Sequence, residues 1–301
     1  MRSRFRSRFD GGQASLFSSY DMRSVKNILL YWSMFFIIFV IAMICLIPVI
    51  WIGLSGFKSV KEMYAIPPSF FPKIIDFGKV ADVWSKVNFF KYFVNSIMII
   101  IGCWGFDIVI NGLAGYVLSR LKPVGSKVIE VLIFWSMLLP GISMVPLYMT
   151  FVDMPLIHTN LTGSYMPIWM MAGANAFNVF LFRNFFNGIP IDYVEAASLD
   201  GCSNLGIFLK IILPLSKPII MVVTIFTVVG AWGNFMWPYL ILSNTTFEPV
   251  SVMLYKLSSA GNMSADKYLI VLMLSIIPMI VVYAIFSKQI MGGVDIGGIK
   301  G

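Results

Sequence analysis

The chain has 301 residues, of which 58% are apolar and only 12% are charged, and its net charge is +8. This composition is too apolar for an ordinary soluble domain, and the chain is too long for a single membrane anchor. We therefore expect an all-α, polytopic membrane protein with one membrane domain, 28–287, between a basic tail at 1–27 and a carboxyl-terminal tail at 288–301.

The amino-terminal tail carries much of the positive charge. Six cations precede the first long apolar segment: Arg2, Arg4, Arg6, Arg8, Arg23 and Lys26. The positive-inside rule then predicts a cytoplasmic amino terminus, and nucleic-acid binding is the weaker explanation of the charge. The apolar stretch 28–56 is longer than the ~7–15 residues of a signal-peptide core and lacks its cleavage site, so we expect a retained helix.

Six segments are long and apolar enough to predict bilayer-spanning helices. They are 28–56, 89–118, 128–150, 164–186, 218–241 and 268–287. An even number of spans returns the carboxyl terminus to the cytoplasm, and the basic loop 119–127 agrees with this orientation. The outside loop 57–88 argues weakly against it, because that loop contains five lysines and three acids.

The loop between the fourth and fifth spans, 187–217, is polar and contains EAASLDG from Glu195 to Gly201. Asp192 followed by Glu195 is a capping-box pattern, which predicts a short helix at 193–199. Gly201 can adopt the positive φ of a turn. A second helix at 205–212 would end before Pro214. A loop that merely connects two spans remains the alternative.

The second short helix is also predicted to be amphipathic. Helical spacing places Leu205, Phe208, Leu209 and Ile212 on one face. Two short helices joined at a glycine turn form a stiff element, which is suited to transmitting rigid-body motion.

The loop residues Glu195-Ala196-Ala197-x-x-Asp200-Gly201, with Phe208, Ile211 and Pro214, resemble the EAA loop of membrane subunits of binding-protein-dependent ABC importers. The stretches 137–148, 181–190, 232–242 and 297–301 are similar to the carbohydrate branch, specifically the shorter, six-span partner of the maltose-importer type. The alginate-oligosaccharide importer subunit is one such member. Cys202 departs from the family, which usually has Ala there, and residues 1–25 lie outside its pattern.

The resemblance implies a set of partners in a bacterial inner membrane. These are a second permease subunit, two ATPase subunits, an extracytoplasmic binding protein and an oligosaccharide. The chain has no G-x-x-x-x-G-K-[ST] phosphate loop, so it is expected to be non-catalytic and to bind no cofactor, with ATP and Mg on the ATPases.

The resemblance also assigns residue roles. The expected ATPase-coupling residues are Glu195, Ala196, Ala197, Asp200, Gly201, Phe208 and Pro214. In the tail, Gly298, Lys300 and Gly301 would reach between the ATPases, unless that end is simply a flexible glycine segment.

Polar residues within the spans are candidates for the sugar path. Asn175, Asn178, Trp232 and Asn234 could bind hydroxyls or stack on sugar rings, and helix packing explains them equally well. Asp107 is either functional or a hydrogen-bonded link between helices. An ion-driven secondary carrier is the alternative function, and it would need more intramembrane charges and inverted repeats. The outside lysines leave both neutral and acidic sugars open.

Overall fold

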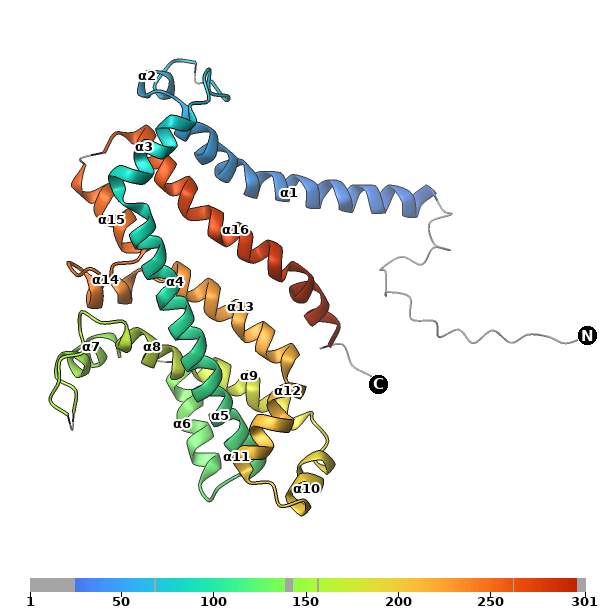
Figure 1. Ribbon diagram of the computed structural model, residues 1–301. Coiled ribbons are helices and arrows are strands. Elements are labelled where there is room, and N and C mark those ends of the chain that lie inside the picture. The colour runs from blue at the N-terminus through green and yellow to red at the C-terminus, as the bar shows by residue number, and fades with distance from the viewer. Residues whose placement is uncertain (1–24, 68, 139–142, 156, 262, 297–301) are drawn as a thin grey trace, which may run out of the picture.

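The computed structural model describes residues 25–67, 69–138, 143–155, 157–261 and 263–296, and Figure 1 shows their arrangement. In these ranges the regular structure is helical, apart from an isolated bridge between Met154 and Thr159. The predicted all-α class is therefore confirmed. The predicted tail contacts at Gly298, Lys300 and Gly301, like the basic residues before Val25, lie outside the described residues.

Within the described residues, three uninterrupted helices are long and apolar enough to cross a bilayer. The first is α1 (Val25–Phe57) and the last is α16 (Ala265–Ile296), whose membrane-length part is Ala265–Ser287. The second runs from Phe89 to Leu121 and comprises α4 (Phe89–Phe106), η2 (Asp107–Asn111), α5 (Gly112–Tyr116) and η3 (Val117–Leu121). In Figure 1, α1 lies beside one end of α16 and diverges from the other helices toward its amino terminus.

The other three expected spans are helical but interrupted. The third consists of α6 (Ser126–Leu138) and α7 (Met144–Val152), the fourth of α8 (Met166–Gly173) and α9 (Ala176–Asn187), and the fifth of α13 (Lys217–Gly233) and α14 (Met236–Leu242). At two of the breaks an asparagine side chain accepts a hydrogen bond from the first turn of the next helix. Asn175 Oδ1 accepts a hydrogen bond from the Asn178 amide, and Asn234 Oδ1 accepts one from the Trp237 amide.

The segments outside the spans contain α2 (Val60–Met63), α3 (Phe77–Val87) and α15 (Val250–Ala260). Lys79 links the carboxyl-terminal end of α1 to the amino-terminal end of α16, and Lys58 lies beside it. Lys79 pairs with Asp266 at 2.6 Å and donates hydrogen bonds to the carbonyls of Gly56 and Lys58 at 3.0 and 2.8 Å. Lys58 is only 1% exposed; it donates to the Ser69 carbonyl and lies over the Trp51 ring. These lysines therefore act as internal links.

The second span and α9 approach each other closely at Gly115. A Cβ at this position would lie 2.6 Å from Cβ of Phe182 and 3.0 Å from the backbone nitrogen of Arg183. Only glycine fits such a distance without moving one of the two helices. The close approach brings the second span against the helix that leads into the polar loop.

Candidate functional site

The polar loop folds into short helices around a glycine turn, as predicted. These are α10 (Asp192–Leu199), α11 (Asn204–Ile207), η4 (Phe208–Ile212) and α12 (Leu213–Leu215). Gly201 has a φ of +80°, and its amide donates to the Ser198 carbonyl at 3.1 Å. The Cys202 amide donates to the Ala197 carbonyl at 3.0 Å. This pair of bonds is the Schellman arrangement that ends a helix, so the predicted turn at Gly201 is confirmed.

The predicted capping box is wrong. Ile191 occupies the N-cap position, and its carbonyl accepts hydrogen bonds from the Val194 and Glu195 amides. Asp192 is already the first helical residue, and no side-chain capping bond forms at this end of α10. A capping side chain requires a residue outside the helix, which Asp192 is not. Its charge still lies in the first turn, where it complements the helix dipole.

The predicted apolar face of the second short helix is wrong in two of its four residues. Phe208 and Ile212 are buried, whereas Leu205 and Leu209 are 57% and 50% exposed. Leu209 lies in the π-helical segment Phe208–Ile212, whose wider turn departs from the simple helical spacing that the prediction assumed. Ile207 joins the buried side instead.

The buried side of the loop packs into an aromatic cluster that we call the loop core. Its members are Tyr116, Phe182, Phe186, Ile189, Ala197, Ile207, Phe208, Ile212, Ile219 and Val223. The Phe208 ring centroid lies 5.2 Å from that of Tyr116 and 6.4 Å from that of Phe186. The loop is thus packed against the second span, α9 and α13.

The loop core divides the EAA-type residues into two sets. Ala197 and Phe208 point inward and are buried. The exposed set is Glu195, Ala196, Asp200, Gly201 and Pro214. The structure therefore gives the first set a packing role within this chain and leaves the second set on the surface.

Two arginines anchor the helix that enters the loop. Arg120, at the end of the second span, donates to the carbonyls of Phe186 and Ile189. Arg183 forms a two-bond ion pair with Glu130 of α6, at 3.0 and 2.9 Å. Both cations stabilise the carboxyl-terminal half of α9. The sequence did not predict these two contacts, because hydrogen bonding between distant segments leaves no local pattern.

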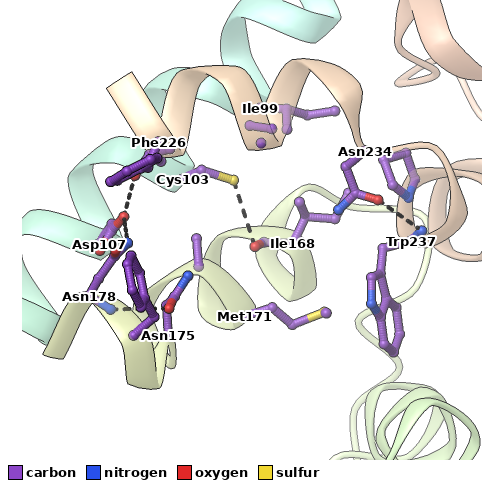
Figure 2. A pocket seen from close by; sticks show the side chains of 16 residues that line it. Ile99, Cys103, Asp107, Ile168, Met171, Asn175, Asn178, Phe226, Asn234 and Trp237 are labelled. Atoms are coloured by element: carbon purple, nitrogen blue, oxygen red, sulfur yellow. Dashed lines mark hydrogen bonds between the residues drawn. The ribbon is translucent and has the colours of Figure 1, made fainter. Parts of the chain in front are cut away.

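A cavity of about 380 Å³ lies between the second, fourth and fifth spans, at the breaks in the latter two (Figure 2). It is lined by Ile99, Cys103, Asp107, Ile168, Met171, Ala172, Asn175, Phe177, Asn178, Phe226, Thr227, Gly230, Ala231, Asn234, Trp237 and Pro238. We call it the amide cavity. Three predicted path residues, Asn175, Asn178 and Asn234, meet here.

Trp232 does not line the amide cavity. Its ring centroid lies 6.2 Å from that of Phe93, and it packs with α4, α15 and α16 on another face of α13. Trp237, just beyond the break at Asn234, supplies the indole that lines the cavity (Figure 2). The break reorients the chain, so a residue near it cannot be placed by extending α13.

Asp107 forms the hydrogen-bonded end of the amide cavity. Its carboxylate accepts hydrogen bonds from Asn111 at 2.6 Å, from Asn178 at 2.7 Å and from the Thr227 hydroxyl. These donors lie on η2, α9 and α13, so the carboxylate joins three spans. The interpretation of Asp107 as a link between helices is the one the structure supports.

Sequence reasoning missed the cavity residues Phe177, Phe226, Thr227 and Trp237. A usable signal was present at both breaks. Gly173-Ala174-Asn175 and Gly233-Asn234 place an asparagine, a residue type that favours helix starts, within two residues of a glycine in an apolar segment. Such a pattern predicts a helix restart, and a restart within a span creates room for a cavity.

Comparison with known proteins places the chain in a family. The model of the family described as "Binding-protein-dependent transport system inner membrane component" matches residues 86–292. The polygalacturonan/rhamnogalacturonan transport system permease protein YtcP of Bacillus subtilis (strain 168) is 27% identical over 92% of this chain and 100% of its own length. The diacetylchitobiose uptake system permease protein NgcG of Streptomyces coelicolor is 26% identical over 85% of this chain and 84% of its own.

A solved structure shares the fold. A chain of a bacterial ABC transporter involved in the import of the acidic polysaccharide alginate superposes with a TM-score of 0.77. The two are 24% identical, and the match covers 88% of this chain and 98% of the other. The resemblance noted in the loop sequence is thus confirmed over most of the molecule. The chain belongs to the family of inner membrane components of binding-protein-dependent transport systems.

Proposed function

We propose that this integral membrane protein is a permease subunit of an ATP-driven ABC importer for an oligosaccharide. With a second permease it forms the translocation path, and an extracytoplasmic binding protein delivers the sugar. The family match supports the importer class, and the sugar-permease relatives support a carbohydrate substrate. The chain does no chemistry itself; two ATPase subunits bind and hydrolyse ATP with Mg.

The single observation that carries the coupling role is the division of the polar loop. Glu195, Ala196 and Asp200 are exposed beside the turn at Gly201, while Ala197 and Phe208 fix the same element to the loop core. A small residue between two carboxylates lets another protein approach closely and pair its cations. Motion of an ATPase docked there would pass into the second span, α9 and α13.

The orientation of the chain in the membrane follows from the coupling role of the polar loop. The loop 187–217 must face the ATPases, so it lies in the cytoplasm, and both chain termini lie on that side of a bacterial inner membrane. The tail residues Gly298, Lys300 and Gly301 would then reach toward the ATPases.

The test is copurification in mild detergent from the native membrane, followed by mass spectrometry. We expect an ATPase and a second permease with the wild-type chain. Glu195→Lys, Asp200→Lys and Ala196→Leu should each release the ATPase while membrane insertion is retained. Ala260→Leu is the matched control, because Ala260 is also exposed but lies at the end of α15 on the opposite side of the membrane.

Retention of the ATPase and of transport in all three loop variants would show that these side chains are not part of the coupling contact with the ATPase. Uptake by the chain reconstituted alone would instead support the secondary-carrier alternative. In that case Asp107→Asn should abolish uptake, because a carrier needs its intramembrane carboxylate to bind the driving ion.

A further inference from the structure

None of the described residues that line the amide cavity carries a cationic side chain. Among its described lining residues, the polar ones are Asp107, Asn175, Asn178, Thr227 and Asn234, and none is Lys, Arg or His. A carboxylate that leaves water is costly to bury unless a cation or several hydrogen-bond donors compensate it. A site for a uronate ring is therefore expected to contain at least one Lys or Arg, and this side of the path supplies none.

The acid that lines the amide cavity offers no binding partner to a uronate. Asp107 is an acid, and its three donors, Asn111, Asn178 and Thr227, are already directed at its own carboxylate. A sugar carboxylate would lie beside another acid in a partly desolvated space and would gain none of these donors. Asp107 therefore disfavours acidic rings as well as joining helices.

The remaining polar groups suit hydroxyls. Asn178 is 2% exposed, its Nδ2 is used by Asp107, and its Oδ1 has no partner within the described structure. An unpaired buried carbonyl needs a donor, which a sugar hydroxyl provides. The Oδ1 atoms of Asn175 and Asn234 accept backbone amides of α9 and α14, which leaves their NH₂ groups to donate to hydroxyl oxygens.

Aromatic side chains complete the lining. Phe177 and Phe226 make an edge-to-face pair with ring centroids 5.8 Å apart, and the indole of Trp237 lies on the side of Asn234 (Figure 2). Apolar ring faces pack on the C–H faces of a sugar, and the volume of about 380 Å³ is in the range of small-molecule pockets, ~300–1,000 Å³.

The lysines of the loop 57–88 do not favour an acidic cargo. Lys58 and Lys79 are engaged within the protein, and Lys86 pairs with Asp82 at 2.8 Å. Among the described residues of this loop, Lys61 and Lys73 are the exposed lysines that form no ion pair within the chain, so the surplus of positive charge offered to a ligand is small.

We propose that the amide cavity is a subsite for an uncharged sugar ring and that the imported oligosaccharide is neutral rather than a uronate. This inference rests on the proposed importer function and narrows its substrate class. Asn178 accepts a hydroxyl proton, Asn175 and Asn234 donate to hydroxyl oxygens, Trp237 packs on a ring face, and Asp107 disfavours carboxylated rings.

The test uses a matched pair of sugars, a galacturonate trisaccharide and its carboxyl-reduced form. The two differ only because each carboxylate of the first is a hydroxymethyl group in the second. The assembled transporter carries Met171→Cys, because Met171 lines the cavity. It is treated with a thiol reagent in the absence of the binding protein. Mass spectrometry then measures labelling of this cysteine. We expect the reduced trisaccharide to protect the cysteine at a concentration at least about tenfold lower than the uronate, or ~1.4 kcal/mol.

A second measurement assigns the effect to this cavity. Trp237→Leu should weaken protection by the reduced trisaccharide about tenfold, whereas Trp232→Leu, which removes an indole outside the cavity, should leave it unchanged. Thermal midpoints of both variants separate loss of binding from loss of folding.

Equal or better protection by the uronate would overturn the inference. So would protection by neither sugar, or equal loss in the two tryptophan variants. Failure of the importer function is recognised separately, because it would appear as absence of an ATPase in copurification. If an ATPase copurifies but neither sugar protects the cysteine, the proposed function stands and only this subsite is rejected.

Discussion

The loop core and the amide cavity are built on the same three segments of chain and have opposite character. At the loop core, Tyr116, Phe186 and Val223 of the second span, α9 and α13 are buried among other apolar side chains. One turn further along α13, Thr227 donates to Asp107, and the lining becomes polar and open. Close packing transmits displacement, whereas a partly filled polar space adapts to different occupants. One three-helix unit thus combines a rigid end and an adaptable end.

The largest effect is expected from breaking the rigid end. Phe208→Ala removes a ring that contacts Tyr116 and Phe186, and it should lower the free energy of unfolding by about 3–5 kcal/mol. Denaturation of the detergent-solubilised chain measures this. Leu209→Ala, at the exposed neighbour, should change stability by less than about 0.5 kcal/mol. Similar losses in both variants would show that η4 is not anchored by its buried side.

The contact between the second span and α9 gives the next largest effect. Gly115→Val would place side-chain atoms where Phe182 and the α9 backbone already lie, and it should cost up to about 3 kcal/mol through overpacking. Gly105→Val in the same span is the control, because a Cβ at Gly105 would meet no atom within 4 Å. Thermal midpoints of the two variants should differ clearly, and equal midpoints would contradict the close approach.

A smaller effect is expected at the boundary between the two ends. Asp107→Asn keeps the shape but weakens hydrogen bonds from Asn111, Asn178 and Thr227, and it should cost about 1.5 kcal/mol. Asp153→Asn, in an exposed loop, is the matched control. If Asp107 acts only as a link, the variant still transports the neutral sugar once folded, and uptake in vesicles measures this.

The smallest effect is expected outside both regions, at Asp82. The hydrogen bond from Lys86 is the main cause that lowers the pKa of the Asp82 carboxyl, and Lys267 of α16 adds to it. A lowered folded-state pKa gives stability above the unfolded value, ~3.9, and that stability is lost as pH falls through the folded value. Thermal midpoints of wild type and Asp82→Asn should therefore differ slightly near neutrality and converge in acid. A constant difference would contradict the ion-pair explanation.

Elements governed by local sequence were predictable. Composition indicated the helical membrane class, and the glycine at 201 indicated the turn, because both depend on properties of single segments. The capping of α10 was not predictable in the same way, because the pattern of Asp192 and Glu195 suits either of two helix starts one residue apart. The π-helical turn at Phe208–Ile212 was missed for a related reason: simple helical periodicity assumes 3.6 residues per turn.

The cavity depended on contacts between distant segments. The hydrogen bonds of Asp107 link positions 107, 178 and 227, and no single-segment pattern predicts that these three meet. The asparagines were singled out as polar residues in apolar spans, which is a chemical signal. Trp232 shows the limit of reasoning from residue type. It was a predicted path residue but does not line the cavity, because the direction of a side chain near a helix break depends on the break.

The breaks at Asn175 and Asn234 have a consequence for solvent. Where a helix is interrupted at membrane depth, backbone groups lose their intrahelical partners, and such a stretch is tolerated when it is buried in protein or lines a hydrated space. Both asparagines line the amide cavity, so water is the natural partner of these groups between transport cycles. The hydroxyls of a neutral sugar that enters there replace these water molecules nearly one for one. Hydrogen bonding then changes little on entry or exit, and a subsite with this property lets its cargo leave as readily as it arrives.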